Sequence, residues 1–135
     1  MNHSAVCCCG KVSLVIQGQP IVKAICHCND CKKRTGSAFG ISIYVKNSQV
    51  TETQGSTSVY EVDTDVQQQR FFCTNCGTTI YWKVSNFPDL TGIAGGCFTD
   101  MDFIEPEYTI SNENICSWVS LPSKLKTEIT QASFQ

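Results

Sequence analysis

Seven of the ten cysteines in this 135-residue chain lie in three short clusters whose spacing is typical of metal ligands. The clusters are Cys7-x-Cys9-Gly10, Cys26-His27-Cys28-x-x-Cys31 and Cys73-x-x-Cys76-Gly77. A structural zinc ion takes four protein ligands, whereas a catalytic zinc ion takes three and keeps one position open. Seven clustered thiols therefore predict two zinc ions per chain, one in a closed site and one in an open site.

The closed site is predicted to consist of four thiols, the four-cysteine group: Cys7, Cys9, Cys73 and Cys76. Residues i and i+2 of an extended segment point to the same side, so the first two thiols can bind one ion together. Cys8 then points the other way, although the alternative in which Cys8 replaces Cys7 stays open. Gly77 suits the tight backbone of a zinc knuckle. Such a site contributes on the order of 10 kcal/mol to folding.

The open site is predicted to consist of three thiols within six residues, the three-cysteine group: Cys26, Cys28 and Cys31. Three thiolates leave tetrahedral zinc one vacancy, which is the arrangement of a catalytic site. A fourth protein ligand would instead make the site structural, and the candidates are His27, Cys97 and Cys116. The histidine ring of an extended Cys-His-Cys segment leaves from the face opposite both thiols. Cys97 and Cys116 are expected to be small buried residues.

Disulfide bonds and dithiol redox chemistry are the other uses of paired cysteines. The chain runs from Met1 to Val6 into the first cluster without the basic start and apolar stretch of a signal peptide. A cytoplasmic protein with reduced cysteines is therefore expected. A thioredoxin-like Cys-x-x-Cys needs a strand-to-helix context, and no clear helical period follows either pair. Metal binding is the preferred interpretation.

Composition limits the classes of function. A chain of 135 residues that is 41% hydrophobic can bury one ordinary core, so residues 1–135 are expected to form a single domain. The net charge is −2, and the basic residues are dispersed apart from Lys32-Lys33-Arg34, which disfavours nucleic acid as a partner. No apolar run is long enough to span a membrane. The sequence leaves the oligomeric state open.

The elements that must position the clusters are predicted to be mainly β-strands. An apolar period of two, together with β-branched and aromatic residues, indicates strands at residues 12–16, 39–45, 58–62, 70–72, 78–82 and 91–96. One short helical turn is expected from Asn29 to Lys33. His3 is expected in a mobile terminus, and the residues from about 123 to 135 in a loosely held tail.

The clusters and the residues around them resemble the glutathione-dependent formaldehyde-activating enzyme family. The motifs are Cys-x-Cys-Gly from Cys7, Cys-His-Cys-x-x-Cys-x-x-x-x-Gly-Ser-Ala-Phe from Cys26, and Phe-Cys-x-x-Cys-Gly-Thr from Phe72. They follow the family's order over nearly the whole chain, as far as Trp118. The resemblance implies a mainly β, Mss4-like fold with a structural zinc in the four-cysteine group and a catalytic zinc in the three-cysteine group.

The resemblance also implies a lyase-type carbon–sulfur reaction, the condensation of glutathione with formaldehyde to S-(hydroxymethyl)glutathione. Zinc with a vacancy can bind the glutathione sulfur and lower its pKa below the roughly 8.5 of a free thiol. Polarisation of the aldehyde is the alternative role of the metal. The negative charge of three thiolates weakens zinc as a Lewis acid, so thiol activation is favoured. A non-catalytic thiol carrier and a protein-binding zinc module are the alternative functions.

The carboxylates of glutathione would need cations and hydrogen-bond donors near the zinc. Lys33, Arg34 and Ser37 follow Cys31 directly and are the predicted binding residues. An ordinary solvated basic turn is the plainer interpretation of this run. A thiol pocket could also use aromatic side chains, although such residues in a small β-domain belong more often to the core; the candidates are Phe39, Tyr44, Trp82 and Trp118.

Overall fold

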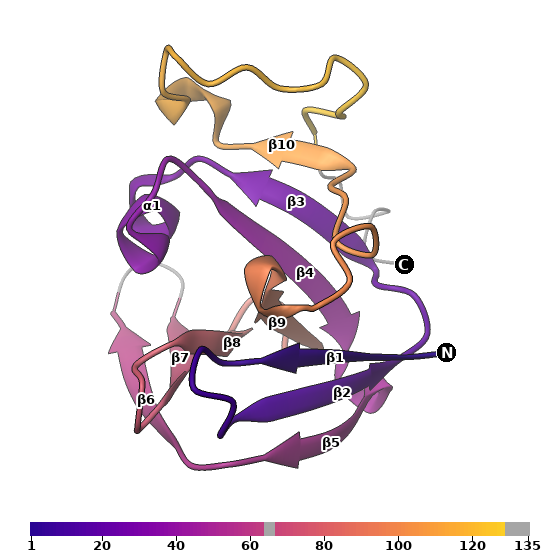
Figure 1. Cartoon of the computed structure of the whole chain (residues 1–135). Coiled ribbons are helices and arrows are strands. Elements are labelled where there is room, and N and C mark those ends of the chain that lie inside the picture. Colours follow the sequence, from indigo (N-terminus) through magenta and orange to yellow (C-terminus); the bar gives the residue numbers. More distant parts are fainter. Residues whose placement is uncertain (64–66, 129–135) are drawn as a thin grey trace.

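Two β-sheets make up the fold of the computed structural model, which describes residues 1–63 and 67–128. The smaller sheet has the order β1 (Asn2–Val6), β2 (Ser13–Gln17) and β5 (Val50–Gln54). The larger sheet has the order β10 (Tyr108–Ile110), β3 (Val22–Cys26), β4 (Gly40–Lys46), β9 (Leu90–Ala94), β8 (Thr79–Val84), β7 (Gln68–Cys73) and β6 (Thr57–Val62). Figure 1 shows β10 and β3 at one end of this sheet and β6 and β7 at the other. The prediction of a mainly β fold is confirmed.

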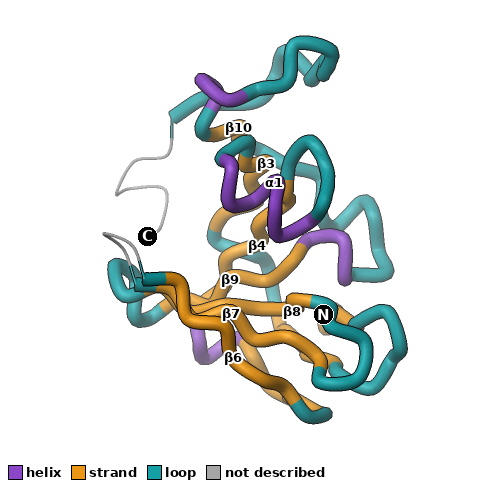
Figure 2. Tube along the Cα trace, turned by 90° about the vertical axis from the view of Figure 1, so that its left-hand side faces the viewer, coloured by secondary structure: helices purple, strands orange, loops and turns teal. Residues whose placement is uncertain are grey.

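The helices among the described residues are short. They are α1 (Asn29–Thr35) and the 3₁₀-helices η1 (Asn47–Gln49), η2 (Gly95–Cys97) and η3 (Asn112–Asn114). The side view in Figure 2 shows α1 beside β3 and β4. The expected helical turn at Asn29 to Lys33 is confirmed, and the helix continues to Thr35 before Gly36 ends it with a φ of 67°. Within the described part of the chain, every helix is too short or too polar to cross a membrane.

The core lies between the two sheets. One face of strand β4 packs into this core, and its other face points away from it. Successive residues of a strand point to opposite faces. Ile43 and Val45 are therefore fully buried against the smaller sheet, whereas Ser42 and Tyr44 face the other way. The core residues packed with them include Val12, Leu14, Ile16, Ile80, Ile93 and Phe98. Burial of these aliphatic side chains contributes about 1.5–3 kcal/mol each relative to exposure.

Among the described residues, six strands follow the predicted segments and four strands were not predicted. Strand β5 is polar and exposed, and β3 is buried on both faces, so neither has an apolar period of two. Strand β9 ends at Ala94, where the prediction continued to Gly96, because the chain turns into η2. His3 was expected in a mobile terminus, and this expectation is wrong. It lies in β1, pairs with Ile16 of β2 and stacks on Phe103 with ring centroids 3.7 Å apart.

The described part of the expected tail contacts the larger sheet. Leu125 is buried, and Lys126 forms a parallel bridge with Tyr108 of β10. The amide of Thr109 donates to the carbonyl oxygen of Lys126 at 2.8 Å. The rest of that segment, residues 129–135, lies outside the described residues.

Candidate functional site

The four-cysteine group is brought together from two distant parts of the chain. The Sγ atoms of its four members all lie within 4.8 Å of one another. Those of Cys7 and Cys9 are 3.6 Å apart, and those of Cys9 and Cys73 are 3.7 Å apart. Cys8 is exposed and lies outside the group, and its backbone amide donates to Oγ1 of Thr78 at 3.2 Å. The group therefore uses the register in which Cys7 and Cys9 point to one side.

The backbone around these thiols suits metal ligation. The amide of Val12 donates to Sγ of Cys7 at 3.2 Å, and the amide of Asn75 donates to Sγ of Cys73 at 3.4 Å. Gly10 and Gly77 follow the two halves of the group with φ values of 81° and 79°, as the turns require. A hydrogen bond from the Thr78 side chain lowers the pKa of Cys76 to about 5. Four thiols with such support fit a tetrahedral zinc ion.

The three-cysteine group lies where β3 ends and α1 begins. The Sγ atoms of Cys26, Cys28 and Cys31 lie within 4.8 Å of one another, and those of Cys26 and Cys28 are 3.4 Å apart. Cys28 caps α1, because its Sγ accepts a hydrogen bond from the amide of Cys31 at 3.3 Å. Among the residues that the structure describes, no other histidine, cysteine or carboxylate joins this group.

The three candidates for a fourth ligand are placed elsewhere. His27 is fully buried, and its Nε2 lies 3.0 Å from Oγ1 of Thr109. Its ring therefore leaves from the side opposite the neighbouring thiols, as the strand geometry predicts. Cys97 and Cys116 lie outside the group, and the expectation that both are buried is wrong, because each is partly exposed.

The thiols of the three-cysteine group shift one another's pKa values. A hydrogen bond from Cys31 lowers the pKa of Cys26 to about 5. The same bond raises the pKa of Cys31, and burial raises the pKa of Cys28. One thiolate therefore suppresses the ionisation of its neighbours when no metal is present. A divalent cation removes this conflict, so the donor set fits zinc, which binds thiolates.

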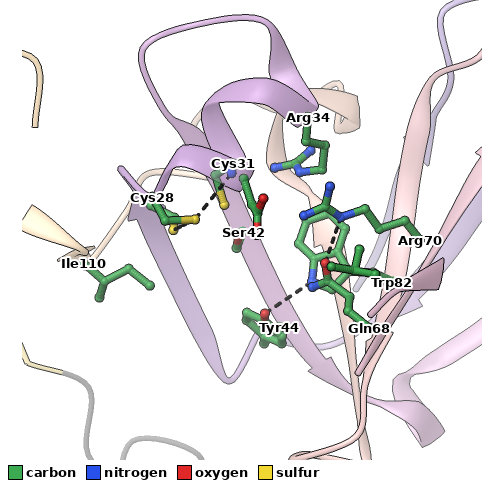
Figure 3. Close-up of a pocket in the computed structure, with 12 residues that line it drawn as sticks. Cys28, Cys31, Arg34, Ser42, Tyr44, Gln68, Arg70, Trp82 and Ile110 are labelled. Atoms are coloured by element: carbon green, nitrogen blue, oxygen red, sulfur yellow. Dashed lines mark hydrogen bonds between the residues drawn. The ribbon is translucent and has the colours of Figure 1, made fainter. Parts of the chain in front are cut away.

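A cavity of about 230 Å³ opens beside the three-cysteine group (Figure 3). Its floor is a row of paired residues across the larger sheet: Tyr44 pairs with Gly92, Gly92 with Trp82, and Trp82 with Arg70. Directly paired residues project from the same face of a sheet. Further residues line the walls, among them Asp30, Arg34, Ser42, Val62, Gln68 and Ile110.

Gly92 makes room for the floor of this cavity. The indole ring of Trp82 lies directly over Gly92, where a β-carbon would overlap Nε1 and the neighbouring ring atoms. The ring can then reach β4, and Nε1 donates a hydrogen bond to the hydroxyl of Tyr44 at 3.2 Å. The two rings meet edge to face at a centroid distance of 6.4 Å.

Replacement of Gly92 by alanine is therefore expected to displace Trp82 and lower the free energy of unfolding by about 1–3 kcal/mol, the usual cost of overpacking. Urea unfolding of the zinc-loaded protein measures this change, and near-ultraviolet circular dichroism reports the displaced ring. Gly96→Ala is the matched control, because a β-carbon there has no neighbouring atom within 4 Å. Equal stability of the two variants would contradict the role assigned to Gly92.

Two arginines reach this cavity from opposite sides. Arg34 extends from α1, and its guanidinium carbon lies 4.6 Å from the centroid of the Trp82 ring. Arg70 extends from β7, and its Nε donates to Oε1 of Gln68 at 2.7 Å. Figure 3 shows both guanidiniums beside Trp82, with that of Arg34 on the side of Cys31, its neighbour in α1.

One of the three residues predicted to bind glutathione lines the cavity, and the other two do not. Arg34 lines the cavity, whereas Lys33 and Ser37 are exposed and do not line it. The hydroxyl of Ser37 donates to the carbonyl oxygen of Phe39 at 2.9 Å, and it serves the turn after α1. Arg70 belongs to no motif, so sequence reasoning missed it. Trp82, which pairs with Arg70 in the sheet, was the neighbouring residue that the sequence analysis identified as a pocket candidate.

The aromatic candidates are also divided. Tyr44 and Trp82 line the cavity. Phe39 packs edge to face against His27, with ring centroids 5.7 Å apart. Trp118 is 76% exposed.

A family model and curated relatives that match this chain have the same description. The family model described as glutathione-dependent formaldehyde-activating enzyme matches residues 2–114. Curated relatives named "Putative glutathione-dependent formaldehyde-activating enzyme" include proteins of Fusarium vanettenii (24% identical over 122 residues, 88% of this chain), Emericella nidulans (26% over 78 residues, 58%) and Penicillium rubens (24% over 87 residues, 64%). The matched part spans 66%, 40% and 46% of these relatives' own lengths.

A crystal structure of a Rhodobacter sphaeroides protein has a similar fold. The TM-score is 0.59 at 18% identity, and the match covers 76% of this chain and 96% of that chain.

Proposed function

Because this chain belongs to the glutathione-dependent formaldehyde-activating enzyme family, we propose that it condenses glutathione, or a related thiol, with formaldehyde to S-(hydroxymethyl)glutathione. The observation that supports this proposal is the position of the three-cysteine group at the wall of a cavity that also contains two guanidiniums. Such an enzyme would act in the cytoplasm, where thiols stay reduced.

We assign one zinc ion to the four-cysteine group as a structural ion and one to the three-cysteine group. Zinc bound by three thiolates would lower the pKa of a substrate thiol that takes its fourth position, so that the thiol reacts as a thiolate near neutral pH. The residues of the protein position the reactants and transfer the proton. Cys28 and Cys31 face the cavity, and the backbone of α1 holds them.

The reaction forms one carbon–sulfur bond and needs neither an oxidant nor a reductant. The substrate sulfur donates an electron pair to the carbonyl carbon, the carbon–oxygen π pair moves to oxygen, and that oxygen takes up a proton equivalent to the one the thiol lost. Tyr44 and Ser42 are hydroxyl residues that line the cavity, and we assign this proton transfer to them. Burial raises the pKa of Tyr44, so the phenol keeps its proton near pH 7.

The proposal predicts that the zinc-loaded protein accelerates the exchange between formaldehyde and S-(hydroxymethyl)glutathione. Exchange spectroscopy by nuclear magnetic resonance measures this rate against the spontaneous reaction, with an equal concentration of free zinc as the control. A rate equal to the spontaneous one, together with glutathione binding, would identify a thiol carrier and overturn the catalytic assignment. Absence of both binding and acceleration would overturn the thiol substrate as well.

A further inference from the structure

The cavity holds two guanidiniums close together, those of Arg34 and Arg70. We propose that this arginine pair binds a carboxylate of the thiol substrate, so that the site selects anionic thiols over neutral ones. The inference rests on the proposed function, because it takes thiol binding at the three-cysteine group as its premise. It adds the substrate class and assigns specificity to Arg70, which lies in no sequence motif.

Neither Arg34 nor Arg70 forms an ion pair with a carboxylate of the described residues. Within residues 1–63 and 67–128, the one side-chain ion pair joins Lys124 to Glu105. Nη2 of Arg34 is buried and has no hydrogen-bond partner there. Asp30 also lines the cavity but forms an ion pair with neither arginine. A buried charged donor without a partner is unfavourable, so an anion in the cavity would remove this penalty.

Arg34 and Arg70 are like charges that line the same cavity. Like charges in a partly buried site are unfavourable unless an opposite charge lies between them. A carboxylate is suited to this position because a planar guanidinium can donate two parallel hydrogen bonds to it.

Both arginine side chains are held in place by contacts within the protein. Arg34 stacks on the Trp82 ring, and Arg70 is oriented by its hydrogen bond to Gln68. Trp82 in turn is held over Gly92 and bonded to Tyr44. Groups ordered in advance lose little conformational entropy on binding, which is the advantage of a preorganised site.

The size of the cavity limits what it can hold. A volume of about 230 Å³ lies below the roughly 300 Å³ at which pockets for drug-sized ligands begin. The cavity therefore holds a sulfur atom and one carboxylate-bearing arm rather than a whole tripeptide. For glutathione, one of its two carboxylates would meet the arginine pair, and the rest of the molecule would extend through the open mouth.

A matched pair of small thiols tests this inference. The anionic thiol is 3-mercaptopropionate, and its methyl ester is a neutral thiol with the same chain. Isothermal titration calorimetry on the zinc-loaded protein is expected to show that the wild type binds the acid at least about tenfold more tightly, the effect of one charge-assisted hydrogen bond. Arg70→Gln should remove this preference while the affinity for the ester stays the same. Lys124→Gln, which removes an exposed charge, should keep the preference.

The possible failures are distinguishable. Equal affinity of the wild type for acid and ester overturns the arginine-pair inference but leaves thiol binding intact. If neither thiol binds, the proposed function fails, and 3-(methylthio)propionate then tests the anion site alone. Binding of this thioether that Arg70→Gln weakens would support the arginine pair, whereas no binding would overturn it.

Discussion

Replacement of Cys73 by serine is expected to unfold the protein under conditions in which the wild type is fully folded. Cys73 is 1% exposed and ends β7, and its group joins this strand to the turn after β1. Structural zinc in small domains contributes on the order of 10 kcal/mol. Because the stability of a whole domain is only about 5–15 kcal/mol, loss of this ion removes most or all of it.

Thermal unfolding followed by circular dichroism, with and without a strong chelator, measures this effect, and elemental analysis reports the zinc content. Cys8→Ser is the matched control, because Cys8 lies between Cys7 and Cys9 but is exposed and outside the four-cysteine group. The control should keep the wild-type melting temperature and two zinc ions per chain. A melting temperature of Cys73→Ser equal to that of the control would exclude a structural metal in this group.

Replacement of Cys28 by serine is expected to abolish the proposed reaction while the protein stays folded. The substitution removes one of three thiols from the three-cysteine group, and the remaining two offer zinc too few ligands. The helix that follows should survive, because serine is a preferred N-cap residue and its hydroxyl can accept the hydrogen bond from the amide of Cys31. The zinc content should fall from two ions per chain to one.

The exchange rate of formaldehyde with S-(hydroxymethyl)glutathione should fall in this variant to that of the spontaneous reaction. Cys116→Ser is the matched control, since this partly exposed cysteine lies outside both groups, and it should keep both zinc ions and the full rate. Unchanged melting curves of all three proteins would show that the loss is not a folding defect. A Cys28→Ser protein that retains two zinc ions would contradict the assignment of Cys28 as a ligand.

The cysteine groups could be predicted from the sequence because short spacings restrict geometry. Cys26, Cys28 and Cys31 are joined by so few residues that their thiols can converge in almost any local conformation. Cys7 and Cys9 were predicted together from the two-residue period of an extended segment, whereas in the structure they lie in the turn after β1, which brings the same two thiols together. The pairing of these two with Cys73 and Cys76 followed from the number of ligands that zinc requires, not from any prediction of how the strands pair.

Other features could not be predicted because they depend on contacts between distant strands. Strand β5 has no apolar pattern, and it exists because it pairs with β2. Strand β1 likewise depends on β2, which is why His3 was placed wrongly. The stability of a strand depends on the strands with which it pairs, and the amino-acid pattern of one segment carries little information about them.

The sequence by itself determined the membership of the two cysteine groups and the mainly β class, because cysteine spacing and apolar period are local properties of the chain. The tertiary structure alone decided what faces the three-cysteine group. Of the three residues predicted to bind glutathione, it places Arg34 at the cavity and leaves Lys33 and Ser37 away from it. It also brings Arg70 beside Trp82 through the pairing of β7 with β8. The physical reason is that a cavity is formed by residues that share a sheet face across several strands, and strand register is set by the packing of the whole domain.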